Sequence, residues 1–572
     1  MRRLLFKICI LAAICHMPYA IWQALAQDST LEFTVDTAAN TILLPKIFKP
    51  NIDLSGRGSG RDTSRPQALA ADEVLSAWEK EIGFGSAYRL QFDLWEIEAL
   101  NKDKAEQAKL LENYENIIKK INDAGGIVIL NIFGTPAGLG NVLDKTSAPI
   151  KLKAFKELIK QHIRNLSCNK KYNIWYEVWS APDIDNFFLG SRQGYFNLYR
   201  QVAESIEELK KEAKIHIPLG GPGVSWWYQN IEGNTVITPE KSLIYELIKF
   251  CSRYRLPLDF ISWHAYSTDP HAEAETTRYN KTAVPLIRDW LSYFNFDRNM
   301  PLMVSEWNYD SGYNALSERG EESYIASSYI LSRLKNMHAA GLDYQFYFSL
   351  EDFQNNKEGI DRNTGIFWFN GEQGGRKSLY NIFRMLGLLG NNMFAADTKV
   401  NDPFTGLIAT RGQDYLSILI YNYIDPDMAM NYLSRSIASL NDAERKAMIN
   451  LAKADKLGKI IDRQIDIGGL RLRGHKLKTA LKKAQELAEE AKNYQSTERK
   501  VKLSIKNLKE DYLYQRYVID SACSLNCEFV PVEEKEISPT ELYQEELGLK
   551  PYSVNLIRLK VKPKEVIQDA QG

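Results

Sequence analysis

Between residues 48 and 390, short apolar runs alternate with longer segments in which apolar positions recur with a helical period. Eight of the apolar runs have the length of a strand: residues 48–54, 88–95, 126–134, 173–179, 215–221, 259–266, 301–309 and 343–350. Most of them are continuously apolar, which is typical of parallel strands buried on both faces. The pattern therefore predicts a largely parallel sheet.

The segments between these runs predict helices. Residues 103–123 carry an apolar stripe with a period near 3.6 residues, and Gly125 follows as an end signal. Residues 192–213, 238–253 and 321–340 have similar patterns. Eight strand–helix units in about 340 residues predict a (β/α)8 TIM barrel. A doubly wound open sheet is the alternative, but no glycine-rich phosphate loop follows any of the strands.

After Gly390 the pattern changes. Residues 405–423 read as two strands around a Gly-Gln-Asp turn, and further strand signals follow at 501–508, 514–520 and 552–561. They predict a small C-terminal antiparallel β-sandwich. The sandwich is interrupted by a helical insertion, residues 431–500, which holds 16 Lys/Arg and 9 Asp/Glu.

The insertion carries an apolar stripe with alternating spacings of four and three residues, formed by Leu477, Leu481, Ala484, Ala488 and Ala491. We expect this stripe to pack on residues 439–454 in a helical hairpin. A binding arm is the alternative to a packed hairpin. The predicted organisation is a barrel over residues 27–395, a sandwich over 396–430 and 501–572, and the helical insertion over 431–500.

Residues 1–26 have the features of a signal peptide. Three basic residues lie among the first seven, an apolar run follows, and Ala24-Leu25-Ala26 provides a small-residue cleavage site. Pro18 interrupts the apolar run, which argues against a membrane-spanning helix. Lipoprotein cleavage before Cys15 is disfavoured by the bulky Ile14. We expect a secreted or periplasmic protein.

Charge and cysteine content narrow the classes of partner. The chain has 72 Lys/Arg and 72 Asp/Glu, so a net charge of zero gives no electrostatic reason to expect nucleic acid or an anionic membrane surface. Neutral ligands remain the open class. Cys523 and Cys527 either close a small disulfide loop or stay free, and no second Cys or His pair accompanies them. We expect no metal and no cofactor.

In a TIM barrel the active site lies at the carboxyl ends of the strands. Seven of the eleven tryptophans fall on or just past the predicted strands: Trp175, Trp179, Trp226, Trp227, Trp263, Trp307 and Trp368. Core packing explains any one of them. Seven together favour an aromatic rim that stacks on sugar rings, because an exposed indole is costly without a ligand.

Glu306 ends an apolar strand between Ser305 and Trp307. A carboxylate there either forms a buried ion pair with an arginine or acts as a nucleophile in acetal cleavage. His264 and Tyr266 end a neighbouring strand. Both are positioned to hydrogen-bond the carboxylate and hold it ionised, although either also fits an ordinary core role.

Four motifs resemble glycoside hydrolase family 39 of the clan A barrels, which includes β-xylosidases, α-L-iduronidases and exopolysaccharide glycosidases. They occur in the family's order: WYEVWSAPD (175–183), GGPG (220–223), DFISWHAYS (259–267) and LMVSEWN (302–308). The resemblance covers residues 45–430 and 501–562, and it implies a barrel followed by a β-sandwich. It also implies a retaining mechanism with two carboxyls roughly 5–5.5 Å apart.

The resemblance assigns the nucleophile to Glu306. In the family, strand four ends in Trp-Asn-Glu-Pro, in which Asn binds the sugar 2-hydroxyl and Glu is the general acid/base. Here Ser180 and Ala181 occupy those two positions. The implied substrate-binding positions are Trp179, Ser180, Trp226, Trp227, His264, Tyr266, Trp307, Asn308 and Trp368.

Alanine cannot transfer a proton, a step that contributes ~10²–10⁴-fold to such reactions. Glu177 faces the same way but lies roughly 13 Å deeper at ~3.3 Å per residue. Asp183 is the first candidate for a substitute acid, and the further candidates are Asp185, Glu351 and Asp352.

The sequence therefore predicts an exported glycoside-hydrolase-like protein that acts on a β-linked oligo- or polysaccharide. Glu306 is its expected nucleophile, and its hydrolytic activity is weakened, altered or lost at Ala181. The main alternative is a degenerate barrel that binds glycan during polysaccharide synthesis or export. A transglycosidase is a further alternative, but it needs a base as well.

Overall fold

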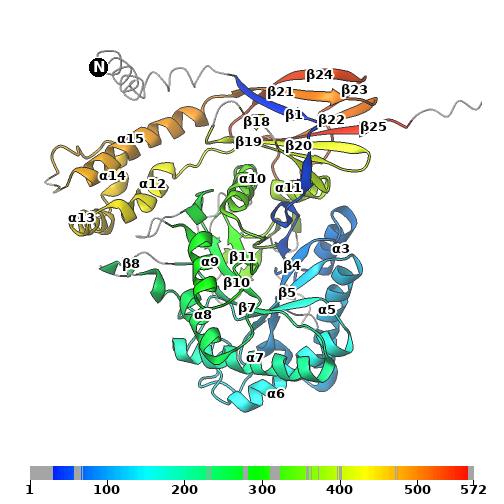
Figure 1. Cartoon of the computed structure of the whole chain (residues 1–572), viewed down its shortest axis with the longest axis vertical. Helices are drawn as coiled ribbons and strands as arrows, with labels where there is room; N and C mark the ends of the chain where they lie inside the picture. Colours follow the sequence, from blue (N-terminus) through cyan, green and yellow to red (C-terminus); the bar gives the residue numbers. More distant parts are fainter. Residues whose placement is uncertain are drawn as a thin grey trace, which may run out of the picture.

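The fold is described from a computed structural model of the chain (Figure 1). The described residues are 30–56, 66, 68–228, 231–232, 235–236, 238–274, 281–309, 322–355, 360–362, 364–370, 373–395, 397–398, 402–470, 472 and 474–563. The expected signal peptide lies outside them and stays a prediction. Within these ranges, no helix combines the length and apolarity needed to span a bilayer.

Eight parallel strands close into a barrel in the order β10-β11-β12-β3-β4-β5-β6-β7. Their bounds are β3 (Ile52–Asp53), β4 (Ala87–Asp93), β5 (Ile127–Phe133), β6 (Ile174–Val178), β7 (Leu219–Val224), β10 (Phe260–Tyr266), β11 (Leu302–Asn308) and β12 (Tyr344–Tyr347). Each predicted strand corresponds to one of these, so the TIM barrel is confirmed. The parallel pairing of β7 with β10 closes the sheet and excludes the doubly wound alternative.

A helix follows every barrel strand. These helices are α3 (Asp72–Glu81), α5 (Lys104–Asp123), α6 (Leu152–Ile163), α7 (Arg192–Ala213), α8 (Leu243–Tyr254), α9 (Ala283–Tyr293), α10 (Ser323–Ala340) and α11 (Ser378–Gly387). The start of α5 is fixed locally by a capping box, in which Asp103 accepts from the Glu106 N–H and Glu106 accepts from the Asp103 N–H. The α5 side chains that face the barrel are apolar and buried, as the sequence stripe predicts.

Short elements decorate the barrel. They are η1 (Lys46–Phe48), α4 (Leu94–Ile97), η2 (Arg164–Asn169), η3 (Pro239–Lys241), η4 (Ala272–Ala274) and the hairpins β8–β9 (Ile231–Glu232, Thr235–Val236), β13–β14 (Phe353–Asn355, Ile360–Arg362) and β15–β16 (Phe367–Asn370, Gln373–Arg376). The three hairpins follow β7 and β12, so they belong to the loops at the carboxyl end of the barrel.

Two sheets form the predicted sandwich. One sheet has the order β18-β1-β21-β24, and the other has the order β2-β17-β19-β20-β25-β22-β23. The bounds are β1 (Leu31–Asp36), β2 (Thr41–Leu43), β17 (Asn392–Phe394), β18 (Asp397–Thr398), β19 (Thr405–Arg411), β20 (Tyr415–Asn422), β21 (Arg499–Leu508), β22 (Tyr512–Ile519), β23 (Glu533–Ile537), β24 (Thr540–Leu549) and β25 (Val554–Val561).

The amino-terminal strand β1 belongs to this sandwich. It pairs in parallel with β21, with Leu31 opposite Val501, and its Leu31, Phe33 and Val35 side chains enter the sandwich core. The sequence placed residues 27–395 with the barrel, so this pairing differs from expectation. The difference arises because the alternating pattern of β1 shows that one face is buried but not which sheet covers it. Figure 1 shows β1 crossing the top of the molecule beside β21.

The insertion is a four-helix unit rather than a hairpin. Its helices are α12 (Met428–Ser436), α13 (Asp442–Lys453), α14 (Leu457–Ile461) and α15 (His475–Gln495), with η5 (Ile437–Ser439) between the first two. Side chains from all four helices share one buried apolar cluster. The predicted stripe lies in that cluster except for Ala491, which packs in the larger core that includes the barrel, and α14 and the contribution of α12 were not anticipated. Their short apolar stretches are weak helix signals in isolation.

The separate core of this unit gives a stability prediction. Leu481 is completely buried within it, so Leu481→Ala should destabilise the insertion by ~2–5 kcal/mol through lost burial and an unfilled cavity. Hydrogen exchange should show faster exchange in α12–α15 and no change in the barrel strands. Exposed Lys482→Ala is the matched control, and equal protection losses in the barrel and insertion would contradict an independent core.

Candidate active site

Charged side chains from four barrel strands meet around Arg89. The Arg89 Nη1 lies 2.7 Å from Asp53 Oδ2 and 3.2 Å from Glu306 Oε2, and its Nε lies 2.8 Å from Glu177 Oε2. These residues come from β3, β4, β6 and β11. A single guanidinium therefore contacts three carboxylates, and its planar fork of donors suits that role.

Burial separates Glu306 from the other members of this cluster. Arg89, Asp53 and Glu177 have side-chain exposures of 2%, 0% and 0%, whereas that of Glu306 is 14%. Glu306 is thus the carboxylate of this group that solvent, or a ligand, can reach. The two alternatives raised by the sequence are compatible, because Glu306 pairs with a buried arginine and stays accessible.

The buried charges perturb one another. Burial opposes ionisation of Glu177, but the charges of Arg89 and His264 and hydrogen bonds from two serines together outweigh that effect, so the pKa of Glu177 is lowered. Burial raises the pKa of Asp53, and the nearby Glu306 charge raises it further. These two effects prevail over the attraction of Arg89, which lowers it. The pKa of Arg89 is also raised, because its carboxylate partners outweigh burial, and the guanidinium stays charged.

Tyr266 and His264 hold the other side of Glu306. The Tyr266 hydroxyl donates to Glu306 Oε1, while His264 Nε2 lies 3.7 Å from Oε2, beyond hydrogen-bond distance. His264 and Glu306 are direct neighbours in the β10–β11 register. Burial, reinforced by the Glu306 charge, raises the pKa of Tyr266 well above its usual value, so the hydroxyl keeps the proton that it donates. The three residues predicted together are therefore adjacent.

The end of β6 has an unusual backbone. Trp179 and Ala181 both lie in the left-handed region, with φ of 71° and 47°, a conformation that non-glycine residues rarely adopt. The Ala181 N–H donates to Gly223 O at 2.7 Å, and the Trp179 indole N–H donates to Phe187 O at 2.9 Å. Ser180 Oγ lies 3.4 Å from Arg89 Nη2, so the expected sugar-binding position contacts the charged cluster.

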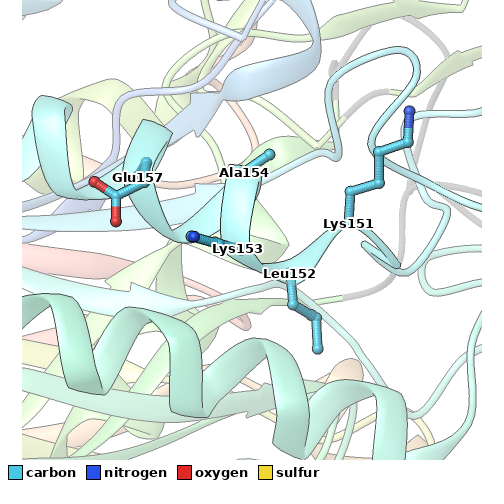
Figure 2. Close-up of a pocket in the computed structure, with 5 residues that line it drawn as sticks. All are labelled: Lys151, Leu152, Lys153, Ala154 and Glu157. Carbon is cyan, nitrogen blue, oxygen red and sulfur yellow. The ribbon is translucent and has the colours of Figure 1, made fainter.

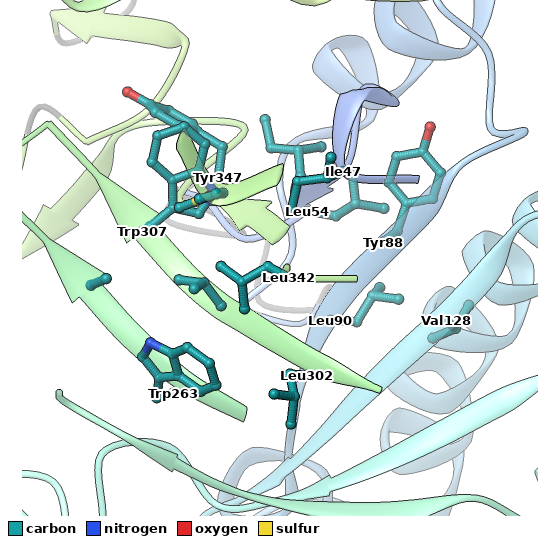
Figure 3. Close-up of a cluster of buried hydrophobic side chains, with 14 of the residues drawn as sticks. Ile47, Leu54, Tyr88, Leu90, Val128, Trp263, Leu302, Trp307, Leu342 and Tyr347 are labelled. Carbon is teal, nitrogen blue, oxygen red and sulfur yellow. The ribbon is translucent and has the colours of Figure 1, made fainter. Parts of the chain in front are cut away.

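Most of the tryptophans do not form a solvent-facing rim. Trp179, Trp227, Trp263 and Trp307 are at most 1% exposed and belong to the barrel core; Figure 3 shows Trp263 and Trp307 among these packed side chains. Trp175 lies at the start of β6, away from the carboxyl end, and its ring packs at a tilt against Phe260. Trp226 and Trp368 are partly exposed. The apolar periodicity of buried parallel strands cannot separate a core indole from a rim indole.

The Asn308 side chain is also hydrogen-bonded within the protein. Its side-chain amide donates to Thr364 O at 2.8 Å and to Phe348 O, and its carbonyl accepts from the Tyr347 hydroxyl at 2.8 Å. These bonds tie the end of β11 to the segment after β12. No hydrogen of the amide remains for a ligand, which differs from the substrate-contact role expected from sequence.

The candidate substitute acids have other partners. Exposed Asp183 accepts from the N–H and hydroxyl of Ser225 at 2.8 and 2.6 Å. Asp352 is buried against Lys377 at 2.7 Å, and Glu351 is buried and accepts from the Ala71 N–H at 2.8 Å. Asp185 is exposed in the loop after β6. Among these four, Asp183 and Asp185 remain accessible.

Arg89, Asp53 and Asn131 were missed by the sequence reasoning. Asn131 on β5 donates to Glu177 Oε2 at 2.9 Å and also to Trp179 O, so it joins the cluster to the end of β6. A signal was present, because each of the three residues is a polar group within a largely buried strand. Such a group must find a buried partner, but the strand pattern does not say which one.

A surface pocket lies apart from this cluster. It has a volume of about 540 Å³ at the first turn of α6, and its lining residues are Lys151, Leu152, Lys153, Ala154 and Glu157 (Figure 2). None of these residues belongs to the Arg89 cluster.

Cys523 and Cys527 form a disulfide, which decides between the two states left open by the sequence.

Comparison with known families identifies the chain. Residues 134–430, just over half of its length, match the family described as Glycosyl hydrolases family 39. The chain belongs to this family. The resemblance stated from the four motifs is therefore confirmed for the family, and the matched region includes Ala181, Tyr266 and Glu306.

Two curated relatives are β-xylosidases. The protein from Geobacillus stearothermophilus is 24% identical over 270 residues, 44% of this family 39 chain and 47% of that protein. The one from Caldicellulosiruptor saccharolyticus is 23% identical over 295 residues, 50% and 56% of the two chains. This chain thus spans about half the length of the curated relatives that it matches.

A solved structure shares the fold over nearly the whole length. The family 39 enzyme from Xanthomonas axonopodis pv. citri superposes with a TM-score of 0.61 at 14% identity, covering 93% of this chain and 98% of that one. The similarity extends through the sandwich as well as the barrel. At this identity it supports the architecture alone.

Proposed function

We propose that this protein is an exported family 39 glycosidase for β-linked glycosides, in which Glu306 is the nucleophile and Ala181 leaves the acid/base position empty. The observation that carries the proposal is the setting of Glu306. It is the accessible carboxylate of the Arg89 cluster, and both of its oxygens are oriented, one by Arg89 and the other by Tyr266. An oriented carboxylate that is open to solvent is what attack on an anomeric carbon requires.

The first chemical step then proceeds with one carboxylate. Glu306 attacks the anomeric carbon, the glycosidic bond breaks, and the leaving oxygen departs with the electron pair. Because Ala181 supplies no proton, departure depends on how well that oxygen carries negative charge. The second step, attack of water on the glycosyl-enzyme ester, has no base at position 181 and is slow. We expect the ester to accumulate.

An azide experiment tests this mechanism. With a 4-nitrophenyl β-glycoside, which needs no acid to leave, azide should accelerate turnover and give a glycosyl azide with retained configuration. Azide is already an anion, so it attacks the glycosyl-enzyme without the general base that water needs. The expected acceleration is on the order of 10²-fold or more. Turnover by absorbance and product configuration by NMR are the measurements.

Glu306→Gln is the matched control, because it keeps the size of the side chain and removes the nucleophile. It should abolish both the ester, detected by intact-protein mass spectrometry, and the azide product. Glycan binding without any ester or azide product from the unmodified protein would support the alternative, a degenerate barrel that binds glycan without turnover. The secondary role of Asp183 is tested in the same assay, since loss of water turnover in Asp183→Asn, with azide turnover retained, would identify Asp183 as the base that activates water.

A further inference from the structure

Two loops at the carboxyl end of the barrel are joined into one unit. Residues 134–151 follow β5 and residues 180–191 follow β6. The Leu189 N–H donates to Thr146 O at 2.8 Å, and the Ala148 N–H donates to Leu189 O at 3.2 Å. We call this pair of segments the double loop. Since βα loops surround the mouth of a TIM barrel, the double loop forms one side of that mouth.

The double loop exposes large apolar side chains. Five of them are between 36% and 80% exposed, and we call them the apolar rim: Val142, Leu143, Ile150, Ile184 and Leu189. Single exposed apolar residues are ordinary, but several on one hydrogen-bonded unit indicate a surface that meets an apolar partner. Within the described part of the chain, no other pair of linked barrel loops carries as many.

The apolar rim is continuous with the candidate site. The Ile184 N–H donates to Ala181 O at 3.1 Å, so the rim begins three residues from the position where an acid would serve the leaving group. The leaving group of a glycoside departs on that side of the site. The apolar rim therefore borders the path of the leaving group rather than the sugar that Glu306 attacks.

Cationic groups lie beside this rim. Ile150 is followed directly by the pocket at the start of α6, in which Lys151 and Lys153 flank Leu152 (Figure 2). Both lysines are exposed. Glu157 also lines this pocket, so it holds a carboxylate together with the two cations and is not by itself an anion site.

We propose that this site cleaves glycosides whose leaving group is an acidic oxygen carried on an apolar body, namely a lipid-like phenol. The proposal rests on the proposed function and names its substrate class. Two independent features lead to it. Ala181 restricts cleavage to leaving groups that depart as anions, and the apolar rim next to Ala181 provides contact for an apolar body.

The reaction balances without a general acid. The bond from Glu306 Oε to the anomeric carbon forms as the bond from that carbon to the leaving oxygen breaks, and the leaving oxygen keeps the electron pair as a phenolate. Water then attacks the anomeric carbon, the Glu306 carboxylate is released, and the proton of that water passes to solvent. No oxidant, reductant or metal is required.

Matched umbelliferyl β-xylosides and β-glucosides test the apolar contact. The 4-methyl and 4-heptyl compounds have leaving oxygens of similar acidity, so they differ in the length of the apolar chain. The heptyl compound should have a KM lower by about tenfold or more, because each additional buried methylene strengthens binding. In Leu143→Ser/Ile184→Ser the advantage should disappear, whereas kcat/KM for the methyl compound stays unchanged. Both residues are exposed, so folding is not at risk.

A second arm uses a dodecyl phosphate diester of the same sugars, in which the phosphate is bonded directly to the anomeric carbon. A higher kcat/KM for this diester than for the heptyl umbelliferyl compound would overturn the phenol as the leaving group. A lower kcat/KM for the diester supports the phenol.

Binding measurements distinguish a failure of this proposal from a failure of the assignment of Glu306 as the nucleophile. Calorimetry with Glu306→Gln measures affinity without turnover, and the heptyl compound should still bind more tightly than the methyl one. A missing chain-length effect in both KM and binding overturns the proposal even where Glu306 proves to be the nucleophile. A chain-length effect in binding without any glycosyl-enzyme would instead overturn the proposed function and leave the apolar contact established.

Discussion

Ala181→Glu should raise kcat/KM for glycosides with poor leaving groups, such as alkyl β-glycosides, by ~10²–10⁴-fold, the usual contribution of a general acid. The substitution places a carboxyl where the family has its proton donor. Position 181 already holds a residue with a Cβ at a φ of 47°, so glutamate adds little backbone strain beyond that of alanine. Nitrophenyl glycosides, which leave without a proton, should gain far less in the first step.

The pH dependence of this variant provides a second measurement. The new carboxyl enters a largely buried position, since Ala181 is 3% exposed. Burial raises a carboxyl pKa, so the group stays protonated at higher pH than a free glutamate. Activity on alkyl glycosides should therefore decline on the alkaline side as this proton is lost, which the unsubstituted protein does not show.

Ala181→Gln is the control for this result. It has nearly the size of glutamate but transfers no proton, so it should leave turnover of alkyl glycosides unchanged. A gain with glutamine equal to that with glutamate would mean that shape rather than acid catalysis limits the site. Ala181→Glu combined with Glu306→Gln should be inactive, because the acid has no nucleophile to assist.

Much of the fold could be predicted because barrel strands are local in sequence. Each buried parallel strand is a continuous apolar run, and its pairing partner is the next run along the chain. The amino-terminal strand β1 breaks that rule, since Leu31 pairs with Val501 across almost the entire sequence. No local pattern encodes such a partner, so the composition of the sandwich was predicted only in part.

The residues of the candidate site could also be predicted only in part from the sequence. Glu306, His264 and Tyr266 could be predicted because each ends a strand and strand ends meet at the barrel mouth. Arg89 lies inside β4, and its importance depends on the three carboxylates that surround it in space. The tryptophans were misjudged for a related reason: Trp263 and Trp307 adjoin site residues in sequence, but their rings point into the core.

Arg89→Met should lower the free energy of unfolding by about 3–5 kcal/mol at neutral pH, the cost typical of removing one partner from a buried ion pair. Methionine fills a similar volume, so the loss reports charge rather than a cavity. Asp53 and Glu177 are then buried without their cation, and both are 0% exposed. Urea unfolding followed by circular dichroism measures the change, and Glu306→Gln, which leaves Arg89 with its two buried partners, should cost much less.

The contribution of Glu177 to the pH dependence of stability should reverse in Arg89→Met, whereas that of Asp53, whose pKa is already raised, keeps its sign. With Arg89 present, the pKa of Glu177 is lowered, so its contribution to stability is complete above the ordinary carboxyl range and is lost as the pH falls. Without Arg89, burial dominates for both Asp53 and Glu177 and raises both pKa values. The variant is then most stable when the two groups are protonated, and it loses stability as the pH rises above about 4, the ordinary carboxyl pKa. The gap between the two proteins should therefore widen from pH 4 to pH 7. A constant gap would show that Arg89 stabilises the barrel by packing alone and that the carboxylates around Glu306 do not depend on its charge.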